Sequence, residues 1–153
     1  MDLKTLQKRI DKLNLNNLFK KIFNLRDVKD FVIERNQEQL YNSGIDATGK
    51  KIKTYFANSP NVYSHTTISY KRAKGQSDTI VTLKDTGAFY NTFKVSAENE
   101  YAELTANFEV HGESIAENLD ITNVLGLTDE NKKILIDYIK PLFLKEFKSE
   151  VLK

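Results

Sequence analysis

The residues of this chain that are capable of acid–base chemistry are few and widely spaced. The two histidines are His65 and His111. We interpret His65, which two threonines follow, as an exposed loop residue, and His111 as a residue at the end of a strand. The acidic residues from Glu98 to Glu109 could supply a carboxylate pair for hydrolysis, but their alternation with apolar residues predicts the solvent face of a hairpin. The sequence therefore predicts no catalytic residue.

Motifs for cofactors and metals are also missing from the sequence. There is no cysteine, which excludes disulfide bonds, thiolate catalysis, thiolate zinc sites and iron–sulfur clusters. The glycines do not have the spacing of a phosphate-binding loop, and neither a calcium-loop pattern nor a histidine pair flanking a glutamate occurs. We expect no cofactor, no metal and no enzymatic activity, and a small hydrolase is the third hypothesis.

One segment, residues 50–78, mixes aromatic and cationic side chains in a way that is typical of binding surfaces. Tyrosine and arginine are favoured at protein–protein contacts, and the same mixture can stack bases and bind phosphates. We favour a protein interface, and a small nucleic-acid-binding module is the alternative. The candidate interface residues are Tyr55, Tyr63, Tyr70, Lys71, Arg72 and Lys74.

The charges of the chain fall into blocks, although its net charge is only +2. Residues 50–84 carry seven basic and one acidic residue, a net +6, whereas residues 85–131 carry one basic and ten acidic residues, a net −9. The two blocks could neutralise each other within one fold, or the basic face of one copy could meet the acidic face of the next, which gives a head-to-tail contact. A third interpretation is a basic loop that contacts phosphate.

Helix signals dominate the first 50 residues and the last 25. Leucines and isoleucines at helical spacing predict helices over residues 3–25, with a break at Asn14–Asn17, and a second helix capped by Asp27 that ends near Asn42. Gly44 follows this helix at the position where a residue with left-handed backbone conformation often ends a helix, so we expect it to cap the C-terminus. Thr128 predicts the start of a C-terminal helix, which Pro141 should kink or split.

The middle of the chain has the signals of loops and strands. Asp46 to Gly49 and Asp85 to Gly87 predict turns, and we expect structural roles for Asp46, Gly49, Thr86 and Gly87. Residues 50–78 predict a long irregular loop, residues 79–83 have strand propensity, and two alternating runs over 93–108 predict a β-hairpin. We therefore expect a single α+β domain over residues 1–153, with N-terminal helices, a small antiparallel sheet built on the hairpin and a C-terminal helix.

Membrane and export signals are not visible in the sequence. The longest apolar runs have three or four residues, whereas a spanning helix needs about 20, and the first residues lack the apolar core of a signal peptide. We expect a protein that is made in a cytosol and that leaves it only within an assembled particle.

Three short motifs, in this order, resemble a known family. Gly44-Ile45-Asp46-Ala47-Thr48-Gly49 follows a long helix, Leu83-Lys84-Asp85-Thr86-Gly87-Ala88-Phe89 precedes the hairpin, and Leu125-Gly126-Leu127-Thr128-Asp129-Glu130-Asn131 opens the last helix. This order is similar to that of the virion morphogenesis and tail-completion (head–tail connector) proteins of tailed bacteriophages, over roughly residues 30–145. The family often has a tryptophan and a proline–leucine pair after the first turn. Here Lys50 to Tyr55 occupy that place and the chain has no tryptophan. The resemblance therefore leaves the position in the ring stack open: adaptor, stopper or tail terminator.

The resemblance implies a structural protein without enzymatic activity. Such proteins form a homo-oligomeric ring between the portal of the head and the tail, and DNA passes through the ring. The expected partners are other copies, neighbouring portal, neck or tail proteins, and non-specific DNA in the lumen, with no membrane. The expected location is the neck or tail region of the virion, after synthesis in the host cytoplasm.

Overall fold

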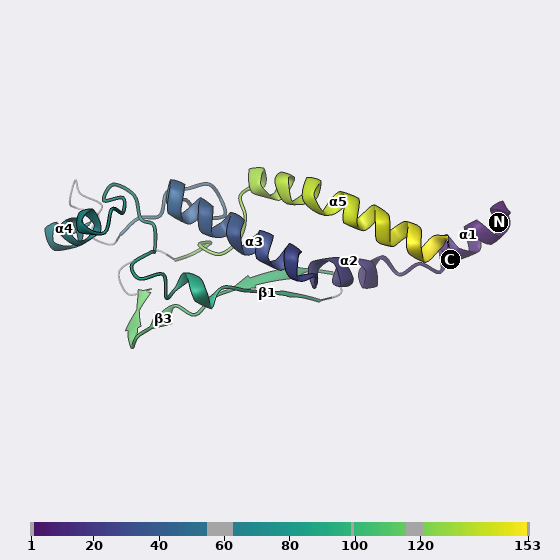
Figure 1. Cartoon of the computed structure of the whole chain (residues 1–153), viewed down its shortest axis with the longest axis horizontal. Coiled ribbons are helices and arrows are strands. Elements are labelled where there is room, and N and C mark those ends of the chain that lie inside the picture. Colours follow the sequence, from purple (N-terminus) through teal and green to yellow (C-terminus); the bar gives the residue numbers. More distant parts are fainter. Residues whose placement is uncertain (1, 55–62, 99, 116–120, 153) are drawn as a thin grey trace.

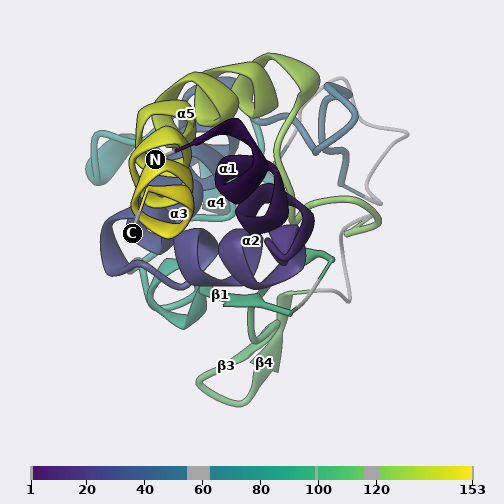
Figure 2. The same cartoon turned by 90° about the vertical axis from the view of Figure 1, so that its right-hand side faces the viewer.

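The computed structural model describes residues 2–54, 63–98, 100–115 and 121–152 of the chain. Helices lie on one face of a small antiparallel sheet in an elongated α+β structure, which confirms the expected fold class (Figure 1). Viewed along the long axis, the C-terminal helix, the middle helices and the sheet form successive layers (Figure 2). Both termini lie at one end of the long axis, and helix α4 lies at the other (Figure 1).

The N-terminal helical segment is broken as predicted, into α1 (Leu3–Asp11) and α2 (Leu15–Phe23). Each helix has a side-chain cap, because Asp2 accepts a hydrogen bond from the Thr5 amide (2.7 Å) and Asn14 accepts one from the Asn17 amide (3.1 Å). The asparagine-rich stretch therefore breaks the helix because it supplies the cap of the next one.

The second predicted helix is α3 (Arg26–Glu38), which continues into a π-helical turn, η1 (Gln39–Ser43). The prediction that Asp27 caps this helix is wrong. Leu25 occupies the cap position without a side-chain hydrogen bond, and Asp27 lies in the first turn, where the helix dipole favours a carboxylate. Gly44 ends η1 in the left-handed conformation (φ +60°), as expected.

The predicted hairpin consists of β1 (Lys94–Ala97) and β2 (Ala102–Thr105), which pair antiparallel with Val95 opposite Leu104. A 3₁₀ turn, η2 (Tyr90–Thr92), precedes it. A second, shorter hairpin pairs β3 (Glu109–Val110) with β4 (Glu113–Ser114). His111 and Gly112 connect β3 and β4, and both have positive φ, as a type I′ turn requires.

The C-terminal helix α5 (Asp129–Val151) begins after Thr128, whose side chain accepts a hydrogen bond from the Asn131 amide. It runs without interruption through Pro141, so the expectation that Pro141 splits the helix is wrong. Pro141 is exposed. The helix buries Leu135 and Val151 and stacks Tyr138 on Phe31 of α3 at a ring distance of 4.2 Å.

Two apolar clusters form the core. The first joins α2, α3 and α5 to β1 through Ile22, Val28 and Val95, and the second gathers around Leu40, Val81, Phe89 and Val124. Ile33 and Leu104 pack against both clusters. Within the described residues, neither cluster includes a residue of α4 (His65–Ala73).

The segment predicted as an irregular loop, 50–78, contains helix α4, so this part of the prediction is wrong for residues 65–73. The helix lacks an apolar stripe, because its buried residue is Lys71, and a search for helical periodicity therefore misses it. The local capping signals were present in the sequence. Ser64 accepts a hydrogen bond from the Thr67 amide, and Gly75 (φ +64°) follows the helix.

The predicted strand at residues 79–83 is also wrong. Leu83 has a φ of +54°, which no β-strand contains. The main-chain groups of Thr82 are satisfied by side chains, since its amide donates to the Tyr63 hydroxyl and its carbonyl accepts from the Tyr90 hydroxyl. Tyrosine hydroxyls thus replace the neighbouring strand that the segment lacks.

Candidate functional site

Helix α4 and the segment that follows it bring most of the described candidate interface residues to one end of the molecule (Figure 1). The helix closes with paired hydrogen bonds from the Gly75 amide to the Arg72 carbonyl (3.0 Å) and from the Gln76 amide to the Lys71 carbonyl (2.8 Å). This is the Schellman arrangement, and Gly75 has the left-handed φ that it requires. The chain then reverses, so that residues 76–85 run back beside α4.

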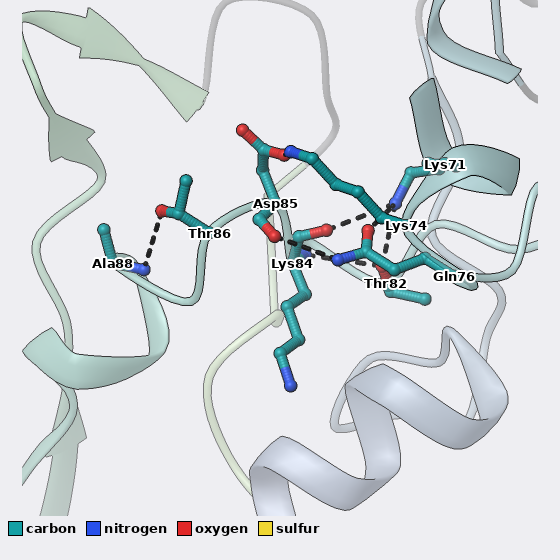
Figure 3. Close-up of polar contacts among 8 residues, drawn as sticks. All are labelled: Lys71, Lys74, Gln76, Thr82, Lys84, Asp85, Thr86 and Ala88. Atoms are coloured by element: carbon teal, nitrogen blue, oxygen red, sulfur yellow. Dashed lines mark hydrogen bonds and ion pairs between the residues drawn. The ribbon is translucent and has the colours of Figure 1, made fainter. Parts of the chain in front are cut away.

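Lys71 faces into the molecule and is only 8% exposed. Its ammonium donates to the Thr82 hydroxyl (3.1 Å), the Lys84 carbonyl (3.2 Å) and the Gln76 side-chain carbonyl (3.3 Å), as Figure 3 shows. It also lies 4.9 Å from the centre of the Tyr63 ring. Burial lowers the pKa of Lys71, and the nearby Asp85 carboxylate opposes that shift. All three donors of Lys71 are therefore used within the chain, and Lys71 holds α4 against the segment 76–85.

Tyr63 is half-buried beside Lys71, and its hydroxyl donates to the Ile80 carbonyl at 3.0 Å. Burial raises the pKa of Tyr63, and the hydrogen bond from Thr82 partly offsets this. Burial also raises the pKa of Tyr90, with Tyr41 and Tyr63 adding to the shift. Tyr63 is thus a structural residue, whereas Tyr70, on the outer side of α4, is 65% exposed.

The other two cations of α4 are exposed but paired within the chain. Arg72 contacts Asp78 (2.6 Å), and this hydrogen bond lowers the pKa of Asp78. Lys74 pairs with Asp85, and the side-chain amide of Gln76 donates to the Asp85 main-chain carbonyl at 2.9 Å (Figure 3). Exposed ion pairs of this kind contribute about 0–1 kcal/mol each, so a partner could compete for both cations.

A hollow of about 330 Å³ lies between α4 and the returning segment. We call it the α4 hollow. Lys71 borders it, and its other lining residues are Thr67, Tyr70, Lys74, Gln76, Lys84 and Asp85. Lys71 and Lys74 bring two ammonium groups and Asp85 one carboxylate to the hollow, so it is cationic. The Lys84 ammonium instead lies over the rings of Tyr41 (4.6 Å) and Tyr90 (5.9 Å), and its side chain points away from the other two lysines (Figure 3). A second hollow of about 300 Å³ lies between residues 83–89 and the β3–β4 hairpin and shares Lys71, Lys84 and Asp85 with it.

The four residues expected in structural turns are all in turns. The Asp46 carboxylate accepts hydrogen bonds from the Thr48 amide (2.8 Å), the Thr48 hydroxyl (2.7 Å) and the Lys50 amide (3.0 Å). Partial burial acts to raise the pKa of Asp46, but these hydrogen bonds outweigh it and the pKa is lowered. Gly49 and Gly87 have φ of +81° and +91°, and the Thr86 hydroxyl accepts from the Ala88 amide at 3.2 Å (Figure 3).

Two of the three resembling motifs lie against each other in the fold. The Ala47 amide donates to the Asn123 carbonyl at 2.8 Å, and a Cβ on Gly126 would lie 3.1 Å from the Ala47 methyl group. The remaining motif, residues 83–89, is the second in chain order and lines both hollows at the α4 end of the chain. The motifs therefore serve two places, the junction before α5 and the surface around α4.

Sequence reasoning missed the two buried amides that hold this junction. Asn36 donates to the Gly126 carbonyl (2.6 Å). Gln39 accepts hydrogen bonds from the Thr128 amide (3.0 Å) and the Asn131 side chain (3.1 Å). The available signal was the i, i+3 spacing of two amides on the inner face of a helix, which marks polar contacts made across that face.

The remaining candidates do not form a catalytic group. His65 is the exposed first residue of α4 and not a loop residue, and His111 lies in the exposed turn between β3 and β4. Within residues 2–54, 63–98, 100–115 and 121–152, no three histidine, aspartate or glutamate side chains are grouped closely enough to hold a metal ion. None of the described helices is both long and apolar enough to cross a bilayer.

The −9 and +6 charge blocks meet in part within one chain. Lys74 of the basic block pairs with Asp85 of the acidic block. Glu98 of the acidic block instead lies 3.5 Å from Lys20 of α2, which is outside the basic block. Several acidic side chains on the two hairpins stay exposed, among them Glu100, Glu103 and Glu113. Tyr55, the remaining interface candidate, lies outside the described residues.

No protein-family model, curated protein or solved structure matches this chain.

Proposed function

We propose that this protein is a structural subunit of a tailed-phage virion, a head–tail connector, neck or tail-completion protein that assembles into a ring through which DNA passes. The observation that carries the proposal is the order of the three motifs along an α+β chain, with a long helix before the first, a hairpin after the second and a C-terminal helix after the third. The resemblance is one of motif order.

The surface around α4 supports a role in assembly. An exposed tyrosine, a cationic hollow and two exposed ion pairs that a partner can displace occur together at one end of an elongated subunit. Aromatic and cationic side chains in this combination are typical of the anchors of protein interfaces. The pairing of Arg72 and Lys74 with carboxylates also reduces the positive charge offered to phosphates, which favours a protein partner over a nucleic acid.

The test is the mass of the purified protein in solution, alone and with the portal and tail proteins encoded in the same genome, by light scattering after size exclusion at low and moderate salt. The expected result is a ring, or a monomer that joins a ring when a partner is added. A monomer that ignores those partners and instead shifts oligonucleotides at low salt would contradict the proposal, because phosphate binding weakens steeply with salt.

A further inference from the structure

Two exposed tyrosines stand in oppositely charged surroundings. Tyr70, 65% exposed, borders the cationic α4 hollow, and Tyr101, 59% exposed, lies in the β1–β2 hairpin between exposed glutamates. We call Glu98, Glu100, Tyr101 and Glu103 the acidic turn. Tyrosine is among the residues that most often anchor protein interfaces, because it buries a large rigid ring and keeps a polar tip.

The two surfaces are complementary in charge. The ammonium groups of Lys71 and Lys74 and one aspartate line the hollow, and three glutamates lie within three residues of Tyr101 in the sequence. The local contacts of the glutamates are weak, since Glu98 lies 3.5 Å from Lys20 across an exposed pair and Glu100 accepts a 3.4 Å hydrogen bond from Asn16. A cationic partner surface can therefore engage both carboxylates with little loss. Complementary charge of this kind sets the register of a contact and speeds its formation.

The two surfaces lie on different parts of the subunit. The contacts of Glu98 and Glu100 place the acidic turn beside α2, whereas α4 lies at the opposite end of the long axis (Figure 1). A contact between two different surfaces of identical chains is heterologous and repeats from copy to copy, closing into a ring where the rotation permits. The two different surfaces that a head-to-tail contact needs are thus present in one chain.

Among the described residues, no strand pairs with the outer edge of β2, so this edge offers a competing contact. Charge opposes that contact. The Glu98 main-chain amide donates a hydrogen bond to the Tyr101 carbonyl (2.9 Å), so the main-chain groups of Tyr101 face β1. Because this orientation alternates along an antiparallel strand, the main-chain groups of Ala102 and Leu104 face away from β1. The antiparallel register that pairs Ala102 of each copy with Leu104 of the other would set Glu103 opposite Glu103. Like charges directly opposite each other destabilise a strand pair.

We propose that the acidic turn of one copy binds the α4 hollow of the next copy, with Tyr101 as the anchor and the glutamates facing Lys74. This inference rests on the proposed ring assembly and names the two surfaces that would form it. Each chain then contributes one hollow and one acidic turn to its two neighbours.

The absence of cysteine from the chain makes cross-linking a direct test. Thr67→Cys labels the hollow, Glu100→Cys labels the acidic turn, and Ser149→Cys, exposed on α5, is the matched control. With a short bis-maleimide, a mixture of the two single variants Thr67→Cys and Glu100→Cys should give covalent dimers. A chain that carries both changes should give a ladder of oligomers, and the pair Thr67→Cys with Ser149→Cys should give no dimer.

Substitution of the anchors gives a second measurement. Tyr101→Ala and Tyr70→Ala should each weaken self-association at least ~10-fold, the usual effect of removing an interface anchor, with the circular dichroism of the monomer unchanged. Leu3→Ala, which shortens a side chain that is 83% exposed outside both surfaces, should leave association unchanged.

The outcomes separate this inference from the proposed function. Rings that form normally from Tyr101→Ala chains, or cross-links absent between the two labelled surfaces of rings assembled from Thr67→Cys and Glu100→Cys chains, would overturn the inference and leave the connector role intact. Cross-links from Glu100→Cys only to a portal or tail protein would overturn it as well, since they assign the acidic turn to a different partner. A chain that stays monomeric with all virion partners would overturn both.

Discussion

Lys71 is the charged residue on which the α4 end of the chain depends. It is buried, its ammonium donates to Gln76, Thr82 and Lys84, and no carboxylate lies among those three partners. A buried donor or acceptor that is left without a hydrogen-bond partner lowers the free energy of unfolding by about 1–3 kcal/mol. Removal of Lys71 would leave its acceptors unpaired in this way. Lys71 therefore acts in folding, and binding at this surface falls to Tyr70 and Lys74.

Lys71→Ala should lower the free energy of unfolding by about 1–3 kcal/mol, because it removes three internal hydrogen bonds and a buried aliphatic stem. Arg72→Ala, on the next residue of the same helix, should cost about 0–1 kcal/mol, since it removes only an exposed ion pair. Urea denaturation followed by circular dichroism measures both. Equal effects of the two changes would show that Lys71 does not hold α4 in place.

Asp46 should make folding sensitive to acid. The pKa of its carboxyl is lowered in the folded chain, so the stabilisation is present above the unfolded value of about 3.8 and is lost as the pH falls through the lowered pKa. Asp46→Asn removes this charge-dependent part. The stability difference between wild type and Asp46→Asn, from urea unfolding at several pH values, should shrink below about pH 4.

At the scale of elements, the turns and junctions decide how the helices meet the sheet. Gly44 ends the π-helical turn η1 at a point where the chain touches residues 80 and 81, and the Ile52 amide donates to its carbonyl at 2.9 Å. The side chains of Asn36 and Gln39 bind the segment 124–128 and so fix where α5 begins. Gly44 allows one close approach between distant segments, and the side-chain amides of Asn36 and Gln39 hold another through hydrogen bonds.

Gly44→Ala should destabilise the protein more than Gly49→Ala. Both glycines have positive φ, which costs a residue with a Cβ about 1–2 kcal/mol. A Cβ on Gly44 would also lie 3.0 Å from the Val81 carbonyl oxygen, whereas a Cβ on Gly49 meets nothing within 4 Å. Urea unfolding of the two variants measures the difference, and equal losses would mean that the close approach at Gly44 relaxes without cost.

At the scale of the whole molecule, stability is uneven along the long axis. The two apolar clusters hold α2, α3, α5 and the β1–β2 sheet, whereas in the described part of the chain α4 is held mainly by Lys71 and by two exposed ion pairs. A region with few buried apolar contacts opens more easily than a packed core. The end that carries the candidate interface is thus the end that a partner can most readily order.

Hydrogen exchange should therefore show amides of α4 (His65–Ala73) exchanging faster than those of α3 (Arg26–Glu38) in the free protein. The physical reason is that α4 can open without disrupting either apolar cluster, whereas α3 cannot. Mass spectrometry of proteolytic fragments gives both rates in one experiment. Protection of α4 equal to that of α3 would contradict this picture of a weakly held end.

The sequence by itself determined the parts of the fold that depend on neighbouring residues. The α+β class, the break at Asn14, the cap at Thr128, the left-handed Gly44 and the β1–β2 hairpin all follow from local periodicity and capping, which act within a few residues. Single-domain organisation and the connector function stay predictions.

The tertiary structure decided everything that depends on contacts between distant segments. Residues 79–83 have the composition of a strand, yet hydroxyls of Tyr63 and Tyr90 satisfy Thr82 and no strand forms there. Lys71 looked like an exposed interface cation, and only the return of the chain behind α4 buried it. Whether a polar group faces solvent or a partner within the chain depends on which segments meet around it, and local sequence does not carry that information.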